Sequence, residues 1–181
     1  MKVIITPTFR AAFVNLVQPK LNMQNKLKYS LVMLFDKNKD GELQEIHAEI
    51  DSIIKERWGE KIPKGLKTPI LDGDTKTHNG FPGSWYINAS TERQPAVVDH
   101  EVKSISAGEI YPGCYCKASI SFWAYDNVQK GISCNLLNVQ KVDEGESLLG
   151  ALTTDPENEF QAITKPKLRT AVKFSSSPVK S

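Results

Sequence analysis

Three aromatic side chains and one lysine share a single face of residues 111–127, YPGCYCKASISFWAYDN, if this stretch is a strand. Successive side chains of a strand point to opposite faces. One face would carry small and apolar residues suited to a packed interior: Cys114, Cys116, Ala118, Ile120, Phe122 and Ala124. The opposite face would carry Tyr115, Lys117, Ser119, Ser121, Trp123 and Tyr125. Flat rings can stack on unpaired bases, and a neighbouring ammonium group can neutralise phosphate. Binding of single-stranded nucleic acid requires both.

The same aromatic face has a second interpretation. Rings in water are unfavourable unless something covers them, so a second layer of this protein could lie over Trp123 and Tyr125. The pattern alone does not decide between the two interpretations. Further rings and cations outside the stretch could join a nucleic-acid site: Trp85, Tyr86, Arg93, Lys76, Lys130 and Lys28.

Two groups of carboxylates could hold a divalent metal ion, as a metal-dependent nuclease would need. Residues 36–47, DKNKDGELQEIH, imitate a calcium-binding loop, but His47 stands where a bidentate Glu is required. Residues 72–74, DGD, lie near His78 without further ligands, and Asp-Gly pairs are common in turns. We therefore predict polar turns, the first with Asp40 capping the following helix, and no metal, cofactor or catalytic residue.

Composition places the chain among ordinary globular domains, with 181 residues, 40% of them hydrophobic and 24% charged. A net charge of +2 is too small to indicate nucleic acid, so any basic surface must be local. Three cysteines without a CxxC pair are typical of reduced core thiols. No apolar run is long enough for a signal sequence or a membrane span, so we expect a cytoplasmic protein without membrane contact.

The elements that must position the aromatic face are predicted to be mainly strands. They are expected at residues 9–18, 29–35, 85–90, 111–127 and 132–142, with hairpins joining the first pair and the last pair. Apolar residues at three- and four-residue spacing predict one amphipathic helix over 42–58, ended by Gly59. Residues 60–84 contain Pro and Gly without periodicity, which predicts a long irregular loop.

The composition changes near the C-terminus. Residues 143–160 contain acidic side chains but no Lys or Arg, and residues 161–181 contain basic side chains but no acid. Such segments bury too little apolar surface to fold. We therefore predict one globular domain over residues 1–152 and a weakly ordered, flexible tail over residues 153–181, acidic first and then basic.

The segments YPGCYCKASISFWAYDN and KGISCNLLNVQKVDEGESL resemble a family of phage-encoded single-stranded DNA-binding proteins with one OB-like domain. The earlier segments KYSLVMLFDK, LDGDTK, WYINAS and QPAVVD agree in order, and the resemblance covers roughly residues 5–160. It implies a mainly β, partly open five-stranded OB-like barrel. It also implies non-sequence-specific binding of single-stranded DNA in phage DNA replication, recombination or repair, inside the infected bacterial host and without enzymatic activity.

Two features depart from the family pattern. Many phage and bacterial single-strand binders end in an acidic tail with a terminal aromatic residue, which recruits replication partners. Here DPENEF, at 155–160, is followed by a basic extension, which puts in doubt the recruitment of phage or host replication and recombination proteins by the tail. The helix directly after the second strand comes earlier than in a minimal OB fold, which predicts an embellished barrel.

The favoured hypothesis is a DNA-binding protein in which bases stack on Trp123, Tyr125 and Tyr115, joined by Trp85 or Tyr86. The phosphates would contact five cations: Lys117, Arg93, Lys76, Lys130 and Lys28. One alternative is a nuclease that uses the carboxylates described above. Another is a structural or assembly β-protein whose aromatic face is a protein interface. The sequence leaves the oligomeric state open, a homodimer included.

Overall fold

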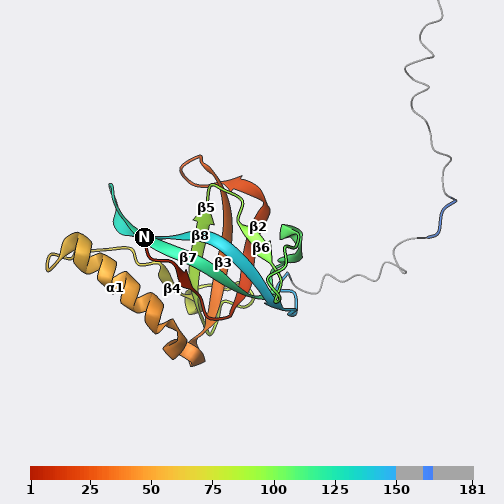
Figure 1. Ribbon diagram of the computed structural model, residues 1–181, viewed down its shortest axis with the longest axis horizontal. Coiled ribbons are helices and arrows are strands. Elements are labelled where there is room, and N and C mark those ends of the chain that lie inside the picture. The colour runs from red at the N-terminus through yellow and green to blue at the C-terminus, as the bar shows by residue number, and fades with distance from the viewer. Residues whose placement is uncertain (150–160, 165–181) are drawn as a thin grey trace, which may run out of the picture. The chain divides into compact units, whose positions relative to one another are not determined.

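The computed structural model describes residues 1–149 and 161–164 of the chain. Its strands form a ring with one long helix lying beside it (Figure 1). The tail predicted over residues 153–181 lies outside the described residues, apart from 161–164. No helix in residues 1–149 or 161–164 has both the length and the apolar character that crossing a membrane requires.

Five strands make the ring, in the order β7-β2-β3-β5-β8 and back to β7. The described strands are β1 (Ile4–Ile5), β2 (Phe9–Leu21), β3 (Leu27–Asp36), β4 (Ile70–Asp72), β5 (Ser84–Thr91), β6 (Ala96–Val98), β7 (Tyr115–Asp126) and β8 (Lys130–Asp143). The β2–β7 and β5–β8 pairings are only two residues long in register, and the second is parallel. The remaining strands extend the edges, because β1 pairs with β7, β4 with β5 and β6 with β8. This confirms the predicted OB-like, partly open five-stranded barrel.

The helix after the second long strand has a different start from the predicted one. The 3-10 helix η1 (Lys37–Leu43) comes first, and α1 (Gln44–Trp58) follows. The prediction that Asp40 caps α1 is wrong, because Asp36 instead accepts from the Asn38 backbone N–H at 2.9 Å and α1 begins without a side-chain cap. The predicted end at Gly59 is confirmed, since its N–H donates to the Lys55 carbonyl at 2.9 Å with φ at 59°.

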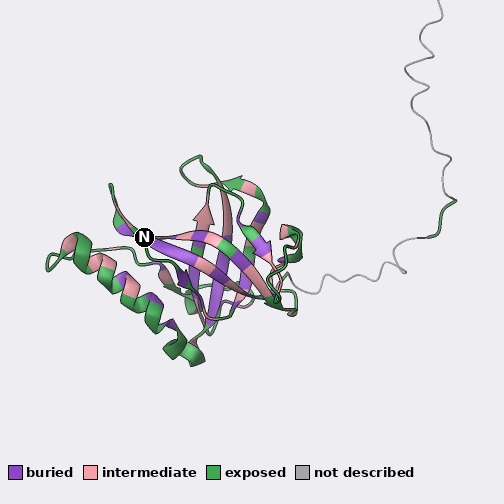
Figure 2. Ribbon diagram, viewed as in Figure 1, coloured by how far each residue is buried: buried purple, intermediate pink, exposed green. Residues whose placement is uncertain are grey.

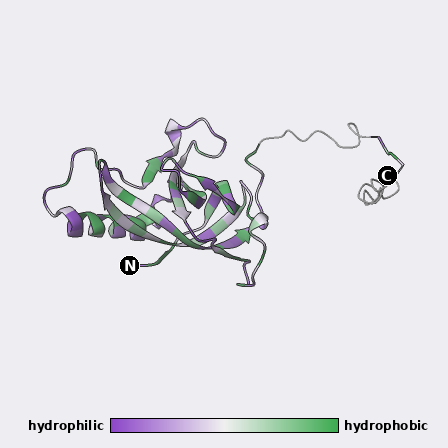
Figure 3. Ribbon diagram, turned by 90° about the horizontal axis from the view of Figure 1, so that it is seen from above, coloured by the Kyte–Doolittle hydropathy of each residue, from purple (hydrophilic) through white to green (hydrophobic). Residues whose placement is uncertain are grey.

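Side-chain alternation along β7 places the core as the sequence predicted. The small and apolar face is buried from Cys114 to Phe122, and α1 adds Ile46 and Ile50 to the same core. Figure 2 shows these buried bands along the strands, and Figure 3 shows the matching alternation of hydropathy. Ser121 departs from the pattern, since it lies on the outward side but is fully buried, with Asn135 Nδ2 donating to its hydroxyl at 3.4 Å.

The loop predicted over residues 60–84 is less irregular than expected. It contains β4, and the 3-10 helix η2 (Gly73–Thr75) follows at once. Its backbone also pairs with β8, because the Lys67 N–H donates to the Lys130 carbonyl at 3.0 Å and the Lys67 carbonyl accepts from the Ile132 N–H at 2.8 Å. Contacts between distant segments therefore order a stretch that has no local periodicity. The last short helix is η3 (Ala107–Glu109).

Candidate nucleic-acid interface

Trp123 and Tyr125 form a pair of rings on the outside of β7. Trp123 is 46% exposed, and the two ring centroids lie 5.9 Å apart with 62° between the ring planes. Tyr125 is half-buried and lies opposite Gly131 of β8, where a Cβ would come within 2.4 Å of the Tyr125 hydroxyl. The glycine therefore leaves room for the Tyr125 ring to lie across the hairpin. No second layer in the described part of the chain closes off Trp123.

Cations lie at the tip of the β7–β8 hairpin around Asp126, which strand alternation places on the opposite face from Trp123 and Tyr125. Lys130 Nζ lies 3.3 Å from Asp126 Oδ1, and Arg57 Nη2 lies 3.4 Å from Asp126 Oδ2. Lys67, which sequence reasoning did not assign to the site, joins them through its backbone pairing with β8. Its loop has no periodicity, so only the tertiary pairing reveals its place. Two cations share the one carboxylate of Asp126, and the Lys67 backbone pairs beside them, so the tip carries local positive charge.

Tyr115 and Lys117 lie at the other end of β7. Tyr115 is 38% exposed, and both residues line a pocket of about 810 Å³ that also contains Arg10, Asp36 and Glu42. Eight residues separate Tyr115 from Trp123, which corresponds to roughly 26 Å along a strand. The structure therefore does not bring Tyr115 and Trp123 into one patch, although a single oligonucleotide lying along β7 could contact both.

Trp85 and Tyr86 are not free aromatic surfaces. Trp85 is half-buried against the core, and Lys37 Nζ lies 4.4 Å from its ring centroid. Tyr86 is only 8% exposed, because the Phe81 ring packs over it with the centroids 5.1 Å apart. Trp85 and Tyr86 lie on opposite faces of β5, as the alternation of a strand predicts. The loop that carries Phe81 covers Tyr86 on the outer face. We therefore leave Tyr86 out of the candidate site.

The remaining predicted cations lie at separate places on the surface. Lys28 lies at the end of the β3–β5 pair where Tyr29 is opposite Thr91, and its Nζ is 3.7 Å from Glu92 Oε1. Arg93 is exposed in the turn just after β5. Lys76 is exposed in the loop that follows η2. These three residues belong to other parts of the surface than the hairpin tip.

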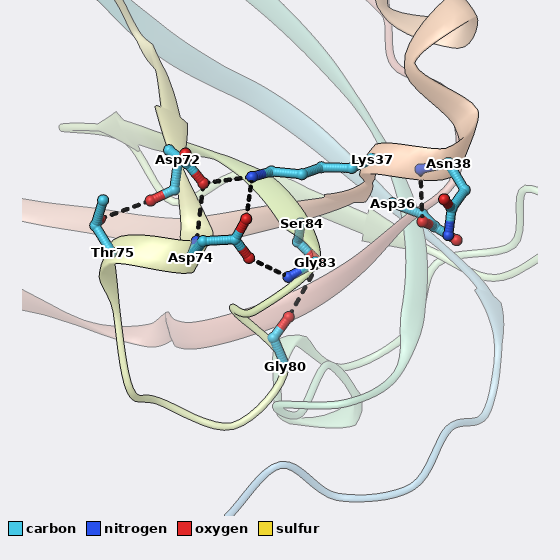
Figure 4. Close-up of polar contacts among 9 residues, drawn as sticks. All are labelled: Asp36, Lys37, Asn38, Asp72, Asp74, Thr75, Gly80, Gly83 and Ser84. Carbon is cyan, nitrogen blue, oxygen red and sulfur yellow. Dashed lines mark hydrogen bonds and ion pairs between the residues drawn. The ribbon is translucent and has the colours of Figure 1, made fainter.

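The DGD carboxylates are held by a lysine (Figure 4). Lys37 Nζ donates to Asp72 Oδ1 and to Asp74 Oδ2, while the Gly83 N–H donates to Asp74 Oδ1 at 2.7 Å. The hydrogen bonds from Lys37 hold the pKa of both carboxyl groups below its usual range and raise the pKa of Lys37. Within the described residues no cluster of three or more His, Cys, Asp or Glu side chains could hold a metal ion. The DGD segment therefore acts as a turn tied to η1.

Replacing this lysine should destabilise the protein in a pH-dependent way. We expect Lys37→Met to lower the free energy of unfolding at neutral pH, because two neighbouring carboxylates lose their cation. A carboxyl group whose pKa is lower in the folded state than in the unfolded state stabilises the fold at pH values above its unfolded pKa of 3.8. This stabilisation is lost as the pH falls through the folded pKa. The difference between the two proteins should therefore shrink as the pH falls from about 5 to about 2.5.

Urea unfolding at several pH values measures this difference. Lys39→Met is the matched control, since Lys39 is exposed in the same 3-10 helix and forms no ion pair in the described structure. If the free energy of unfolding of Lys37→Met stays below that of the wild type by the same amount down to low pH, the ion pairs with Asp72 and Asp74 are not the cause of the loss.

The sequence matches a described protein family over most of its length. The match covers residues 1–168, and the family is described as Enterobacter phage Enc34, ssDNA-binding protein. A protein of Acyrthosiphon pisum secondary endosymbiont phage 1, described as putative protein p50, is 33% identical over 167 residues, which is 86% of this chain and 90% of that one.

Solved structures of phage proteins share the fold. The single-stranded DNA-binding protein of bacteriophage Enc34, in complex with ssDNA, has a TM-score of 0.69 and 28% identity, covering 80% of this chain and 88% of its own. A second structure of the Enc34 protein, described without ssDNA, has a TM-score of 0.70 and 26% identity. It covers 88% of this chain and 90% of its own. The bacteriophage T7 protein gp2.5, a single-stranded DNA-binding protein, shares the fold at 17% identity, with a TM-score of 0.63 over 91% of this chain and 98% of its own.

Proposed function

The chain belongs to the family of phage single-stranded DNA-binding proteins typified by that of Enterobacter phage Enc34, and we propose that it binds DNA mainly through the outer face of the β7–β8 hairpin. It is a single-stranded DNA-binding protein and not an enzyme, and its proposed setting is phage DNA replication. Binding is proposed to be independent of base sequence, because stacking and phosphate contacts act on every nucleotide. Recombination and repair are proposed settings for the same activity, in the cytoplasm of the infected bacterium.

The observation that supports this interface is the exposure of Trp123 beside Tyr125 on the outer face of β7, close along the chain to the cations of the hairpin tip. Each stacked base contributes on the order of 1–3 kcal/mol, and a single OB fold covers ~4–16 nucleotides. Lys130, Lys67 and Arg57 are proposed to contact the phosphates next to the stacked bases. Lys117 and Tyr115 would then contact the strand further along β7, and Trp85 would contribute only through the exposed part of a ring that Lys37 covers.

The two alternative functions have less support. A nuclease would need the carboxylates of residues 36–42 or of the DGD segment for a metal ion. Lys37 pairs with both DGD carboxylates, and no cluster of three or more possible ligands occurs within the described residues. An assembly protein would bury the aromatic face against another copy. A homodimer, which the sequence leaves open, would appear as a doubled mass in light scattering. We also propose that residues 153–181 contact replication or recombination proteins of phage or host, supported by the acidic segment at 155–160.

Tryptophan fluorescence titration tests the proposed function directly. Oligo(dT) should quench the emission, because Trp123 is exposed where the bases stack, and a duplex of equal length should have little effect. Binding to single strands falls with salt with a slope of about −0.7 per phosphate contact, so three contacts give a slope of about −2. Raising the salt concentration fourfold should then weaken binding roughly 15- to 20-fold.

The same samples with Mg²⁺ distinguish binding from cleavage. Intact oligonucleotide after prolonged incubation is expected. Cleavage, or the absence of any affinity for single strands at low salt, would contradict the proposed function.

A further inference from the structure

A second group of aromatic rings lies on the outside of the barrel, formed by Phe13, His78 and Phe81, and is here named the outer aromatic group. The Phe13 ring lies 5.0 Å from His78 at 85° and 5.8 Å from Phe81 at 61°, measured between centroids and ring planes. Phe13 is 51% exposed and His78 is exposed, whereas Phe81 is buried beneath them. None of these rings belongs to the β7–β8 hairpin, so the group is separate from the Trp123–Tyr125 pair.

A β-bulge in β2 turns Phe13 outward. The inward positions of β2 are Phe9 and Ala11 before the bulge, and Val14 and Leu16 after it. The pairing with β3 shifts in register between Ala12 and Asn15, so two residues of β2 oppose one of β3. Both Ala12 and Phe13 consequently lie outside, which regular alternation of a strand does not allow.

The conformation that the bulge imposes on Phe13 carries an energetic cost. Its φ is 43°, in the left-handed region that bulky side chains rarely adopt. Strain of this kind is concentrated at functional sites, where the surrounding structure imposes it. Here the strained residue also leaves half of an apolar ring in water. Both features are unfavourable for folding alone and favour a role in binding.

A pocket of about 680 Å³ adjoins the outer aromatic group. This volume lies within the range of pockets that hold small ligands, so a nucleotide base fits. The lining residues include Phe13, His78, Asn15, Asn79 and Lys20, and the amide groups of Asn15 and Asn79 donate to the Ser30 hydroxyl and the Leu148 carbonyl. None of the lining residues in the described part of the chain is acidic. A ring for stacking, amides and one uncompensated cation complement a base with its phosphate.

We propose that a base of the bound single strand stacks on Phe13 in this pocket, with Lys20 contacting its phosphate. The inference rests on the proposed function, because it adds a second contact for the same ligand. The outer aromatic group lies near the start of β7, since Arg10 of β2 pairs with Tyr115, three residues before Phe13. One strand lying along β7 from Trp123 past Tyr115 therefore continues toward Phe13.

Substitution of Phe13 tests the stacking contact. Phe13→Leu keeps an apolar side chain but removes the ring, and should weaken binding of a long oligo(dT) roughly 5- to 100-fold. Phe13→Trp keeps a stacking surface and should stay within about twofold of the wild type. Val17→Ala is the matched control, because Val17 is 58% exposed on the same strand but does not line the pocket. Circular dichroism and thermal melts establish that each variant is folded.

Photocrosslinking locates the contact independently of affinity. An oligonucleotide carrying 5-iododeoxyuridine should crosslink to the tryptic peptide that contains Phe13, in addition to the peptide of Trp123. Lys20→Gln should also reduce the salt slope by about 0.7.

The outcomes separate this inference from the proposed function. A wild-type protein that fails to bind single strands at all overturns the proposed function itself. A folded Phe13→Leu variant with wild-type affinity and no crosslink at Phe13, while Trp123 still crosslinks, overturns this inference alone. Loss of self-association instead of DNA affinity in that variant would also overturn it, and would assign the surface to a protein contact.

Discussion

Replacing Trp123 and Tyr125 together by alanine is expected to weaken oligo(dT) binding about 30-fold or more while the fold stays intact. Two lost stacking contacts of at least ~1 kcal/mol each give a factor of this size. The barrel should tolerate the change because Trp123 is 46% exposed and the inward face of β7 is untouched. Fluorescence anisotropy of a labelled oligonucleotide measures the affinity, since the variant lacks the tryptophan used in the quenching assay.

Val142→Ala is a suitable control for this double variant. Val142 is 37% exposed on β8, so the control trims a surface side chain of the same hairpin without removing a ring. The two rings couple through their contact, so the single variants need not add up to the double. A folded double variant that binds oligo(dT) like the wild type would remove both rings from the interface and leave the outer aromatic group as the main candidate.

Replacing Gly113 by alanine is expected to destabilise the protein by about 3 kcal/mol, which lowers the melting temperature by roughly 6–12 °C for a chain of this size. The Gly113 φ of 117° is a conformation that only glycine adopts readily, and an added Cβ would lie 2.1 Å from the Glu146 carbonyl oxygen. The N–H of Gly113 donates to the Ala11 carbonyl at 2.8 Å, and Arg10 Nε donates to the Gly113 carbonyl at 3.2 Å. The clash therefore acts where β2 and β7 close the ring.

Thermal melts of Gly113→Ala and Gly41→Ala measure this effect. Gly41 is the control because nothing lies within 4 Å of a Cβ added there and its φ is unstrained. DNA binding should also fall in Gly113→Ala, since Leu148 lines the pocket beside Phe13 and its N–H donates to the Pro112 carbonyl. Equal melting temperatures for the two variants would show that the Gly113 site relaxes without cost.

The five long strands of the ring could be predicted from the sequence because each has a local signature, whereas the short edge strands β1, β4 and β6 were not predicted. Residues 31–35, an unbroken apolar run, are buried on both faces of the strand, but the reason lies outside the run. Leu31, Met33 and Phe35 face the core, whereas Val32 and Leu34 belong to a second cluster that includes Phe81. The apolar run thus indicates coverage without identifying what covers it.

Site residues were harder to predict, because their availability depends on contacts between distant segments. Tyr86 and Trp123 have the same local signature, an aromatic ring on the outward side of a strand. Phe81 covers Tyr86 because the loop before β5 is anchored by Lys37, more than thirty residues away, and nothing equivalent covers Trp123 in the described chain. No pattern within WYINAS or SFWAYD distinguishes the two cases.

The sequence by itself determined the period-two faces of the strands, the amphipathic helix with its end at Gly59 and, through its motifs, the protein family. Only the tertiary structure decided which rings stay uncovered, brought Lys67 to the hairpin tip and turned Phe13 outward at a bulge. The physical reason is that alternation and capping depend on neighbouring residues and their backbone dihedrals, which the sequence displays directly. Burial and register depend on how distant segments fill space around each other, and no local pattern records that.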